Sequence, residues 1–185
     1  MGTANSAATE EAASGTSIFD PVLCEIAYRW FCPPGGTILD PFAGGSVRGV
    51  VASHLDRHYV GIELREEQVL ANRAQLPVCG PAEPVWHVGD SRRIKRIAKG
   101  TQAEFIFSCP PYADLEVYSE DPNDLSTLSY PEFRSSYFEI IRQTCSMLKD
   151  DSFACFAVGD ARGKDGNYYG LPEDTVKAFQ EAGLA

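Results

Sequence analysis

The chain has 185 residues, of which 44% are hydrophobic, enough to build the core of one α/β-sized domain. Its formal net charge of -10 disfavours a surface devoted to nucleic acid, because affinity for a duplex comes largely from Lys and Arg at phosphates. The N-terminus lacks a signal-peptide pattern, and no apolar run approaches the roughly 20 residues that a membrane span needs. The six cysteines form no CxxC pair and the three histidines are scattered, so we expect no metal site, no membrane partner and a cytoplasmic location.

The first structured element is predicted to be a helix. Residues 1–16 consist mostly of small and polar residues and are expected to form a disordered tail, which leaves 17–185 as the domain. Asp20 is a capping carboxylate and Pro21 suits the first helical position. Apolar residues then recur at helical spacing until the run from 33 to 36, Pro-Pro-Gly-Gly, ends the helix.

Strands and helices alternate along the rest of the chain. Strands are predicted at 37–42, 59–64, 85–88, 104–108 and 153–158, and helices at 46–55, 65–75, 91–98, 130–148 and 171–182. Such alternation predicts a three-layer α/β sandwich, with a mostly parallel sheet between two layers of helices. Because a glycine after a helix usually leads into another strand, we expect the chain to be C-terminally truncated and to lack its last edge strands.

A glycine-containing turn joins the first predicted strand to the next helix, and it reads Asp40-Pro41-Phe42-Ala43-Gly44-Gly45-Ser46. Open parallel sheets bind ligands at the carboxyl ends of their strands, where glycine lets a ligand approach the backbone. A carboxylate at the strand end does not suit a pyrophosphate, but it suits a ligand that has an ammonium group and ribose hydroxyls. The alternative is an ordinary tight strand–helix turn.

Two further acidic residues end the next two predicted strands. Glu63 lies 23 residues after Asp40, near the distance at which an acidic residue grips a ribose diol, although it could be a surface residue. Asp90 could accept a hydrogen bond from an adenine amino group, cap the helix that follows it, or do both. That helix is basic, and its positive side chains form either a solvated face or a patch for phosphates: Arg92, Arg93, Lys95, Arg96 and Lys99.

The segment Cys109-Pro110-Pro111-Tyr112 directly follows an apolar strand. Two prolines fix the backbone, so that a carbonyl group cannot rotate away. This rigidity suits a site that holds an amino nitrogen by fixed acceptors and aims its lone pair at a methyl group, and Tyr112 offers a flat face for a base. The alternative is a strand-ending turn with a packed tyrosine.

Together these motifs resemble the amino-methylating DNA methyltransferases, which act on adenine N6 or cytosine N4. The order of the motifs is similar to the gamma arrangement, and in particular to phage and prophage DNA modification methylases. The resemblance covers roughly residues 17–185. It implies the Rossmann-like fold of methyltransferases that depend on S-adenosylmethionine (SAM), with SAM as cofactor and DNA, with one base flipped out, as partner.

The resemblance also implies a role for each motif residue. Phe19, Asp20, Asp40, Pro41 and the Gly44–Gly45 backbone would surround the methionine part of SAM, Phe42 would pack near the sulfonium, Glu63 would bind the ribose and Asp90 the adenine amino group. The Pro110 carbonyl and the Cys109 side chain would bind the target amino group, Pro111 would stiffen the turn and Tyr112 would stack on the base. If the basic helix is a phosphate patch, Arg92, Arg93 and Arg96 are its expected DNA contacts.

Cys109 departs from the family pattern, which usually has Asp, Asn or Ser at this position. A thiol is a weak donor and a weak acceptor, and Ser108 is expected to point the other way by strand alternation. Three functions therefore stay open. The chain is a DNA amino-methyltransferase that favours adenine N6 over cytosine N4, an enzyme that methylates protein glutamine or RNA, or a SAM-binding module with weak activity. The acidic loop at 113–129 could contact the substrate.

Overall fold

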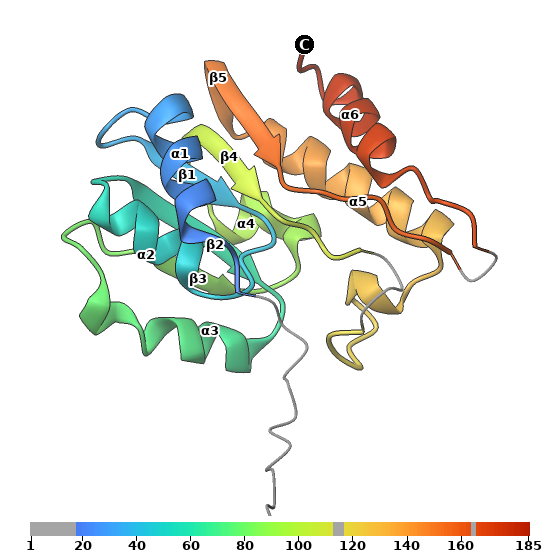
Figure 1. Ribbon diagram of the computed structural model, residues 1–185, viewed down its shortest axis with the longest axis horizontal. Coiled ribbons are helices and arrows are strands. Elements are labelled where there is room, and N and C mark those ends of the chain that lie inside the picture. The colour runs from blue at the N-terminus through green and yellow to red at the C-terminus, as the bar shows by residue number, and fades with distance from the viewer. Residues whose placement is uncertain (1–17, 113–116, 164–165) are drawn as a thin grey trace, which may run out of the picture.

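The computed structural model describes residues 18–112, 117–163 and 166–185, so the predicted tail at 1–16 lies outside the described residues. Five parallel strands form one sheet in the order β3-β2-β1-β4-β5 (Figure 1). Their bounds are β1 (Thr37–Asp40), β2 (His58–Glu63), β3 (Val85–Val88), β4 (Ala103–Ser108) and β5 (Leu148–Phe156). The strand order reverses between β1 and β4, which is where open α/β sheets bind ligands.

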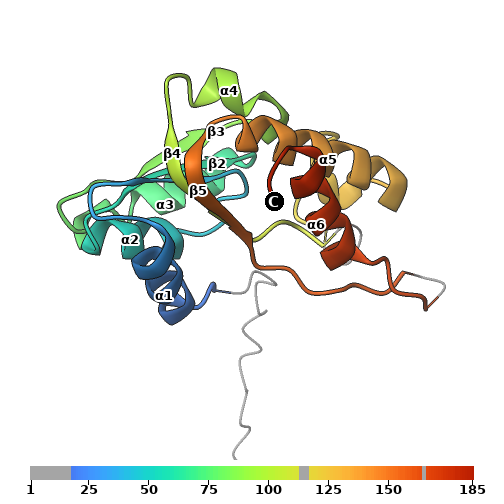
Figure 2. The same ribbon diagram turned by 90° about the horizontal axis from the view of Figure 1, so that it is seen from above.

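Helices cover both faces of this sheet (Figure 2). One face carries α1 (Pro21–Phe31), α2 (Val47–His54) and α3 (Glu66–Arg73), and the other carries α4 (Ile94–Ile97), α5 (Tyr130–Cys145) and α6 (Leu171–Glu181). Short 3-10 turns lie at η1 (Leu76–Val78), η2 (Ser91–Arg93) and η4 (Leu125–Thr127). The predicted three-layer sandwich is confirmed. Within the described ranges, no helix is long and apolar enough to cross a bilayer.

The alternation of strand side chains divides the core into two apolar clusters. Leu39 and Ile106 point to one face, where they pack in the cluster that contains α5. Ile38 and Phe105, their neighbours in β1 and β4, point to the opposite face and pack in the cluster that contains α1. Trp86 of β3 lies in this second cluster and is 1% exposed. A central strand buried on both faces explains why β1 reads as a continuous apolar run.

Three of the predicted elements have bounds that differ clearly from those in the structure. The helix predicted at 130–148 ends at Cys145, and the strand predicted at 153–158 begins at Leu148 and ends at Phe156. The polar run from 149 to 152 is typical of a turn, but it continues the strand through a register shift against β4, and Asp151 has a φ of 56°. The helix predicted at 91–98 is divided into η2 and α4.

Helix α1 begins as predicted, since Asp20 Oδ1 accepts hydrogen bonds from the amides of Val22, at 2.8 Å, and Leu23, at 3.4 Å. Its buried side consists of Cys24, Ala27 and Tyr28, whereas most of its larger apolar side chains face outward. Trp30, near the C-terminal end of the helix, is 74% exposed. The apolar spacing therefore predicts the helix correctly without indicating which face is buried.

Candidate functional site

A cleft with a volume of about 640 Å³ opens at the carboxyl edge of the sheet. This volume lies within the range of roughly 300–1,000 Å³ that is usual for small-molecule sites. The cleft is lined by the turn after β1, by Glu63 at the end of β2, by 89–91 after β3, by 109–112 after β4 and by Asp160 after β5. The sheet thus brings together motifs that lie far apart in the sequence, as expected for parallel strands.

Asp40 lies beneath the wall of the cleft and has no exposed surface. Its carboxylate accepts four hydrogen bonds, from Arg48 Nε at 2.6 Å, the Tyr59 hydroxyl at 2.6 Å, the Ser108 hydroxyl at 2.5 Å and the Phe42 amide at 3.1 Å. The side chain is thereby turned toward the protein interior and is not part of the cleft lining. Asp40 thus holds the turn in shape, and the direct ligand contact that the resemblance implies for it stays a prediction.

Arg48 is a residue of the site that the sequence reasoning missed. Its guanidinium is 5% exposed, and Nη2 donates to the carbonyls of Phe42, at 2.5 Å, and Ala43, at 3.0 Å. Burial alone lowers the pKa of Arg48, but the adjacent Asp40 outweighs it and raises the pKa, so the cation is retained. The place of Arg48 in the first turn of α2 could have indicated its role. A cation there is unfavourable beside the positive end of the helix dipole, unless a carboxylate compensates it.

The two glycines present backbone to the cleft in different ways. Gly44 has a φ of 49°, in the left-handed region that favours glycine. Its amide donates to Glu63 Oε2 at 3.0 Å, and its carbonyl accepts from Asn72 Nδ2 at 2.7 Å. A Cβ added at Gly45 would meet no atom within 4 Å. The turn is therefore anchored from two elements at Gly44, while Gly45 leaves open space beside the cleft.

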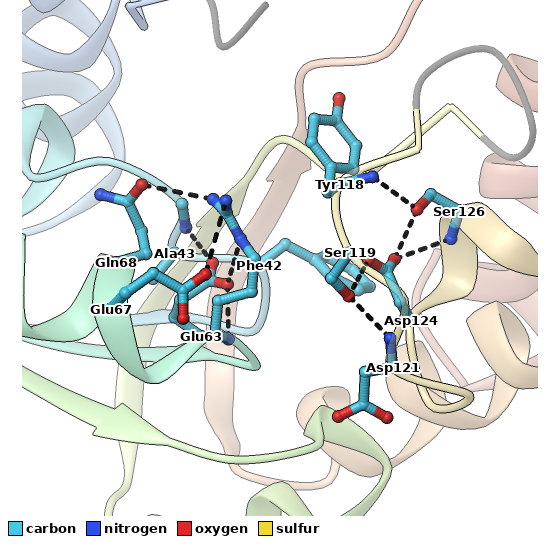
Figure 3. A network of polar contacts seen from close by, with 12 residues as sticks. Phe42, Ala43, Glu63, Glu67, Gln68, Tyr118, Ser119, Asp121, Asp124 and Ser126 are labelled. Carbon is cyan, nitrogen blue, oxygen red and sulfur yellow. Dashed lines mark hydrogen bonds and ion pairs between the residues drawn. The ribbon is translucent and has the colours of Figure 1, made fainter. Parts of the chain in front are cut away.

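Glu63 faces the cleft at the end of β2, beside Phe42 and Ala43 (Figure 3). Its Oε1 accepts from the Arg65 amide at 2.9 Å, and its Oε2 accepts from Gly44. Burial raises the pKa of Glu63, and the hydrogen bonds and charge of Arg65 offset this in part. Since each carboxylate oxygen can accept more than one hydrogen bond, both oxygens keep capacity for a ligand hydroxyl.

Asp90 lines the cleft and also caps η2, so its predicted capping role is confirmed. Its Oδ1 accepts from the Arg92 amide at 2.9 Å, and Arg92 Nε pairs with Oδ2 at 2.9 Å. Arg92 Nη2 in turn donates to Asn123 Oδ1 at 2.9 Å. Arg93 and Arg96, the other two residues predicted to contact DNA, are exposed, and none of the three lines the cleft.

Cys109, Pro110, Pro111 and Tyr112 all line the cleft. The Tyr112 hydroxyl accepts a hydrogen bond from the Gly159 amide at 3.1 Å, which ties the segment to the end of β5. Burial raises the pKa of the Cys109 thiol, which is therefore uncharged at neutral pH. Ser108 points away from Cys109 into the interior, as strand alternation predicts.

The opposite wall of the cleft is formed by 118 and 123–125, in the loop that was predicted to contact substrate. Asp124 organises this wall, because its carboxylate accepts from the amide and hydroxyl of Ser126 and from the hydroxyl of Ser119 (Figure 3). Tyr118 donates its amide to the Ser126 hydroxyl at 3.1 Å. The beginning of the loop, at 113–116, lies outside the described residues.

Four predicted cofactor residues remain, and three of them, Phe19, Pro41 and Phe42, line the cleft. Phe19 lines the cleft, and its ring lies 4.8 Å from the Arg48 guanidinium carbon. Asp20 is exposed, engages the first amides of α1 and is not part of the lining. Within the described part of the chain, no group of three or more His, Cys, Asp or Glu could hold a metal ion.

Comparison with a family of known proteins supports the motif assignment over part of the chain. Residues 24–73 match the model of the N6/N4 methylase family, which is described as DNA methylase. The matched stretch contains the turn after Asp40 and also Glu63. The resemblance to the amino-methylating DNA methylases is confirmed over this stretch.

Two curated relatives have similar sequences. A stretch of 34 residues, 18% of this chain, is 62% identical to the Type II methyltransferase M.SmaI of Serratia marcescens and covers 12% of it. Over 126 residues, 68% of this chain, it is 26% identical to the tRNA (guanine(10)-N2)-dimethyltransferase of Pyrococcus abyssi and covers 37% of it. The chain thus spans well under two thirds of the length of either relative.

The fold itself is found in solved structures. A TehB-like SAM-dependent methyltransferase from Corynebacterium glutamicum superimposes with a TM-score of 0.56 over 93% of this chain and 76% of the other, at 19% identity. The five-stranded parallel sheet and its two helical layers therefore form the Rossmann-like fold of SAM-dependent methyltransferases, as the motifs predict.

Proposed function

We propose that the cleft binds SAM and that the chain belongs to an enzyme that methylates an exocyclic amino group of a DNA base, with adenine N6 favoured over cytosine N4. The observation that carries this proposal is that Glu63, the Gly44–Gly45 turn and the Cys109–Tyr112 segment line one cleft. The match of residues 24–73 to the DNA methylase family supports the choice of acceptor.

The groups around the cleft fit SAM. The open space at Gly45 leaves room for a ligand against the backbone, where a longer side chain would intrude. Glu63 has acceptor capacity for the ribose hydroxyls, and Asp90 has it for the adenine amino group. Phe19 and Phe42 supply ring surface near which a sulfonium is favourable. Asp40 and Asp20 serve indirectly, by shaping the turn and the start of α1.

SAM, when bound, supplies a methyl group on a good leaving group, so the protein has mainly to position the attacking nitrogen. Such positioning can be worth ~7–11 kcal/mol. The Pro110 carbonyl accepts a hydrogen bond from the target amino group and stabilises the positive charge that develops on it. Extruding a base from the duplex costs a few kcal/mol, which stacking on Tyr112 offsets in part. The neutral thiol of Cys109 adds little to this, because it is a weak acceptor.

The basic segment 92–99 is the proposed contact for phosphates. It follows directly on Asp90 and Ser91, which line the cleft, and most of its basic side chains are exposed. Exposed cations beside the cleft would bind a duplex electrostatically despite the overall charge of -10. Arg92 contributes less to this surface, because Asp90 and Asn123 already engage it.

Structured RNA is the second candidate acceptor. The similarity to a tRNA methyltransferase extends over 68% of this chain, further than the match to the DNA methylase family. Methylation of an exocyclic amino group needs the same acceptors and the same stacking surface in RNA as in DNA.

The acceptor is identified by incubating the protein with methyl-labelled SAM and, in parallel, with DNA, tRNA or a cell-protein extract, followed by digestion to nucleosides or amino acids. We expect label in N6-methyladenine from DNA. Label confined to RNA or protein overturns the DNA assignment, and binding of SAM without any labelled product overturns the enzymatic one. A Tyr112→Ala variant is the control, since it is expected to retain SAM and lose transfer.

A further inference from the structure

We infer that the buried hydroxyl of Ser108 is a positioning group that couples the two halves of the cleft. It holds the segment 109–112 in a fixed place relative to the turn at 40–45. This inference rests on the proposed function, in which the first segment binds the acceptor and the second binds SAM. Ser108 itself touches neither of them, because it is fully buried beneath the cleft.

Ser108 lies just beyond the point where the backbone pairing of β1 and β4 ends. The two strands pair at Ile38–Phe105 and at Leu39–Ile106. Beyond these pairs, one residue further in β1 and two further in β4, the Ser108 hydroxyl donates to Asp40 Oδ1 at 2.5 Å. Side chains therefore replace the backbone ladder at the point where the two strands part to form the cleft.

The hydroxyl also reaches into the cofactor turn itself. The Phe42 amide donates to Ser108 Oγ at 3.2 Å, so this single hydroxyl both donates and accepts across the two segments. Asp40 is otherwise held by Arg48 and Tyr59, which belong to α2 and β2. Of the four donors to Asp40, Ser108 alone comes from β4.

The chain that follows Ser108 is stiff, so a displacement of Ser108 also displaces the next residues. Cys109 is followed by two prolines, whose rings fix φ and restrict the residue before each of them. A shift at Ser108 is therefore carried to the Pro110 carbonyl instead of being absorbed. A misplacement of about 1 Å in a reacting pair can lower the rate by about 10²-fold.

The chain offers a matched control in Ser53. This serine is also fully buried, and its hydroxyl likewise donates once and accepts once, to the Val50 carbonyl at 2.6 Å and from the Gly80 amide at 2.9 Å. It does not line the cleft. Loss of either hydroxyl therefore removes the donated and the accepted hydrogen bond named here, but only Ser108 links the two segments.

The test compares Ser108→Ala, Ser108→Thr and Ser53→Ala with the wild type. The quantities measured are the Kd for SAM, kcat with saturating SAM and acceptor, and amide hydrogen exchange at Phe42, Cys109 and Tyr112 without cofactor. For Ser108→Ala we expect faster exchange at these amides and a fall in kcat of about 10²-fold, with a much smaller change in Kd. Ser108→Thr, which keeps the hydroxyl, should recover most of kcat. Ser53→Ala should alter neither kcat nor these amides.

The inference is overturned if Ser108→Ala behaves like Ser53→Ala, because the hydroxyl then serves stability alone. It is also overturned if Kd rises by the same factor as kcat falls, which would indicate general damage to the cleft. If the wild type methylates no acceptor, the proposed function fails, but the exchange rates of the same three variants still decide whether Ser108 couples the two segments.

Discussion

Arg48 Nε lies 2.6 Å from Asp40 Oδ2, and the two side chains are 5% and 0% exposed. This ion pair lies at the end of β1 and supports the turn whose backbone faces the cleft. Each charge is compensated mainly by the other and by hydrogen bonds, since water has almost no access to either. The stability of the protein and the shape of its proposed cofactor turn therefore depend on one pair.

Removal of the cation should destabilise the protein strongly. Arg48→Ala leaves the Asp40 carboxylate buried without its partner, and such a loss costs about 3–5 kcal/mol in the free energy of unfolding. The surface pair of Glu25 and Arg29, with side chains 48% and 57% exposed, provides the comparison. Arg29→Ala should change the free energy of unfolding by less than about 1 kcal/mol. Urea denaturation measures both, and equal losses in the two variants would contradict this account.

Gly45 provides a substitution that separates binding from folding. Gly45→Val places its side chain in open space beside the cleft, so the melting temperature should stay near that of the wild type. SAM affinity measured by titration calorimetry should fall about tenfold or more, which corresponds to about 1.4 kcal/mol. Gly44→Ala is the contrast, because a φ of 49° is unfavourable for alanine by about 1–2 kcal/mol and should lower stability. Unchanged affinity in Gly45→Val would show that SAM does not bind against this turn.

The affinity for SAM should depend on pH through Glu63. Its ionised form accepts hydrogen bonds from ligand hydroxyls, and burial raises its pKa, so affinity should fall with decreasing pH sooner than an ordinary glutamate would cause. Glu63→Gln should bind SAM more weakly at neutral pH and lose this dependence. The contribution of Glu63 to the free energy of unfolding depends on pH with the opposite sign to its contribution to SAM affinity. Because burial penalises the charged form, Glu63 should favour the folded state increasingly as the pH falls through its raised pKa. The SAM affinities of the wild type and of Glu63→Gln are measured by titration calorimetry at a series of pH values. Parallel pH profiles of affinity in the two proteins would refute the prediction.

Cys109 should contribute little to the rate. Its thiol is neutral at ordinary pH and a weak acceptor, so Cys109→Ala should leave kcat within severalfold of the wild type. Cys109→Asp introduces a charged acceptor, and hydrogen bonds to charged groups contribute about 1.5–3 kcal/mol, so kcat should rise at least about tenfold. Single-turnover kinetics measure both variants. A loss of activity in both would identify Cys109 as a specifically adapted residue.

The helices and strands, and the groups proposed to bind ligands, could be predicted because each depends on residues that are neighbours in the sequence. A Gly-containing turn, an acidic strand end and a Pro-Pro-Tyr segment are each read from a few neighbouring residues, and parallel strands carry them to one edge of the sheet. The partners beneath that edge could not be predicted. Ser108 meets Asp40 across 68 residues, and Asn72 meets Gly44 across 28, so both contacts depend on the register of the finished sheet.

The same limit applies to Asp40 and Asp20, whose side chains are not part of the cleft lining. The neighbours of Asp40 in sequence are turn residues, but three of the four donors to its carboxylate come from α2, β2 and β4. Asp20 caps α1, as its capping pattern predicts, and the ligand role that the family order implies for it stays a prediction. Asp40 lies at the end of a strand and Asp20 at the start of a helix. At such positions the direction of the side chain depends on tertiary packing and cannot be read from the sequence.

The chain contains two tryptophans in opposite environments, so intrinsic tryptophan fluorescence can report on both its surface and its core. Trp30 is 74% exposed, so its fluorescence should be red-shifted and accessible to iodide, whereas Trp86, 1% exposed, should emit at shorter wavelength and resist quenching. The Trp86 ring lies 6.0 Å from that of Tyr59, whose hydroxyl binds Asp40. A Trp30→Phe protein would therefore contain one tryptophan, which reports on the core directly beneath the turn that faces the cleft.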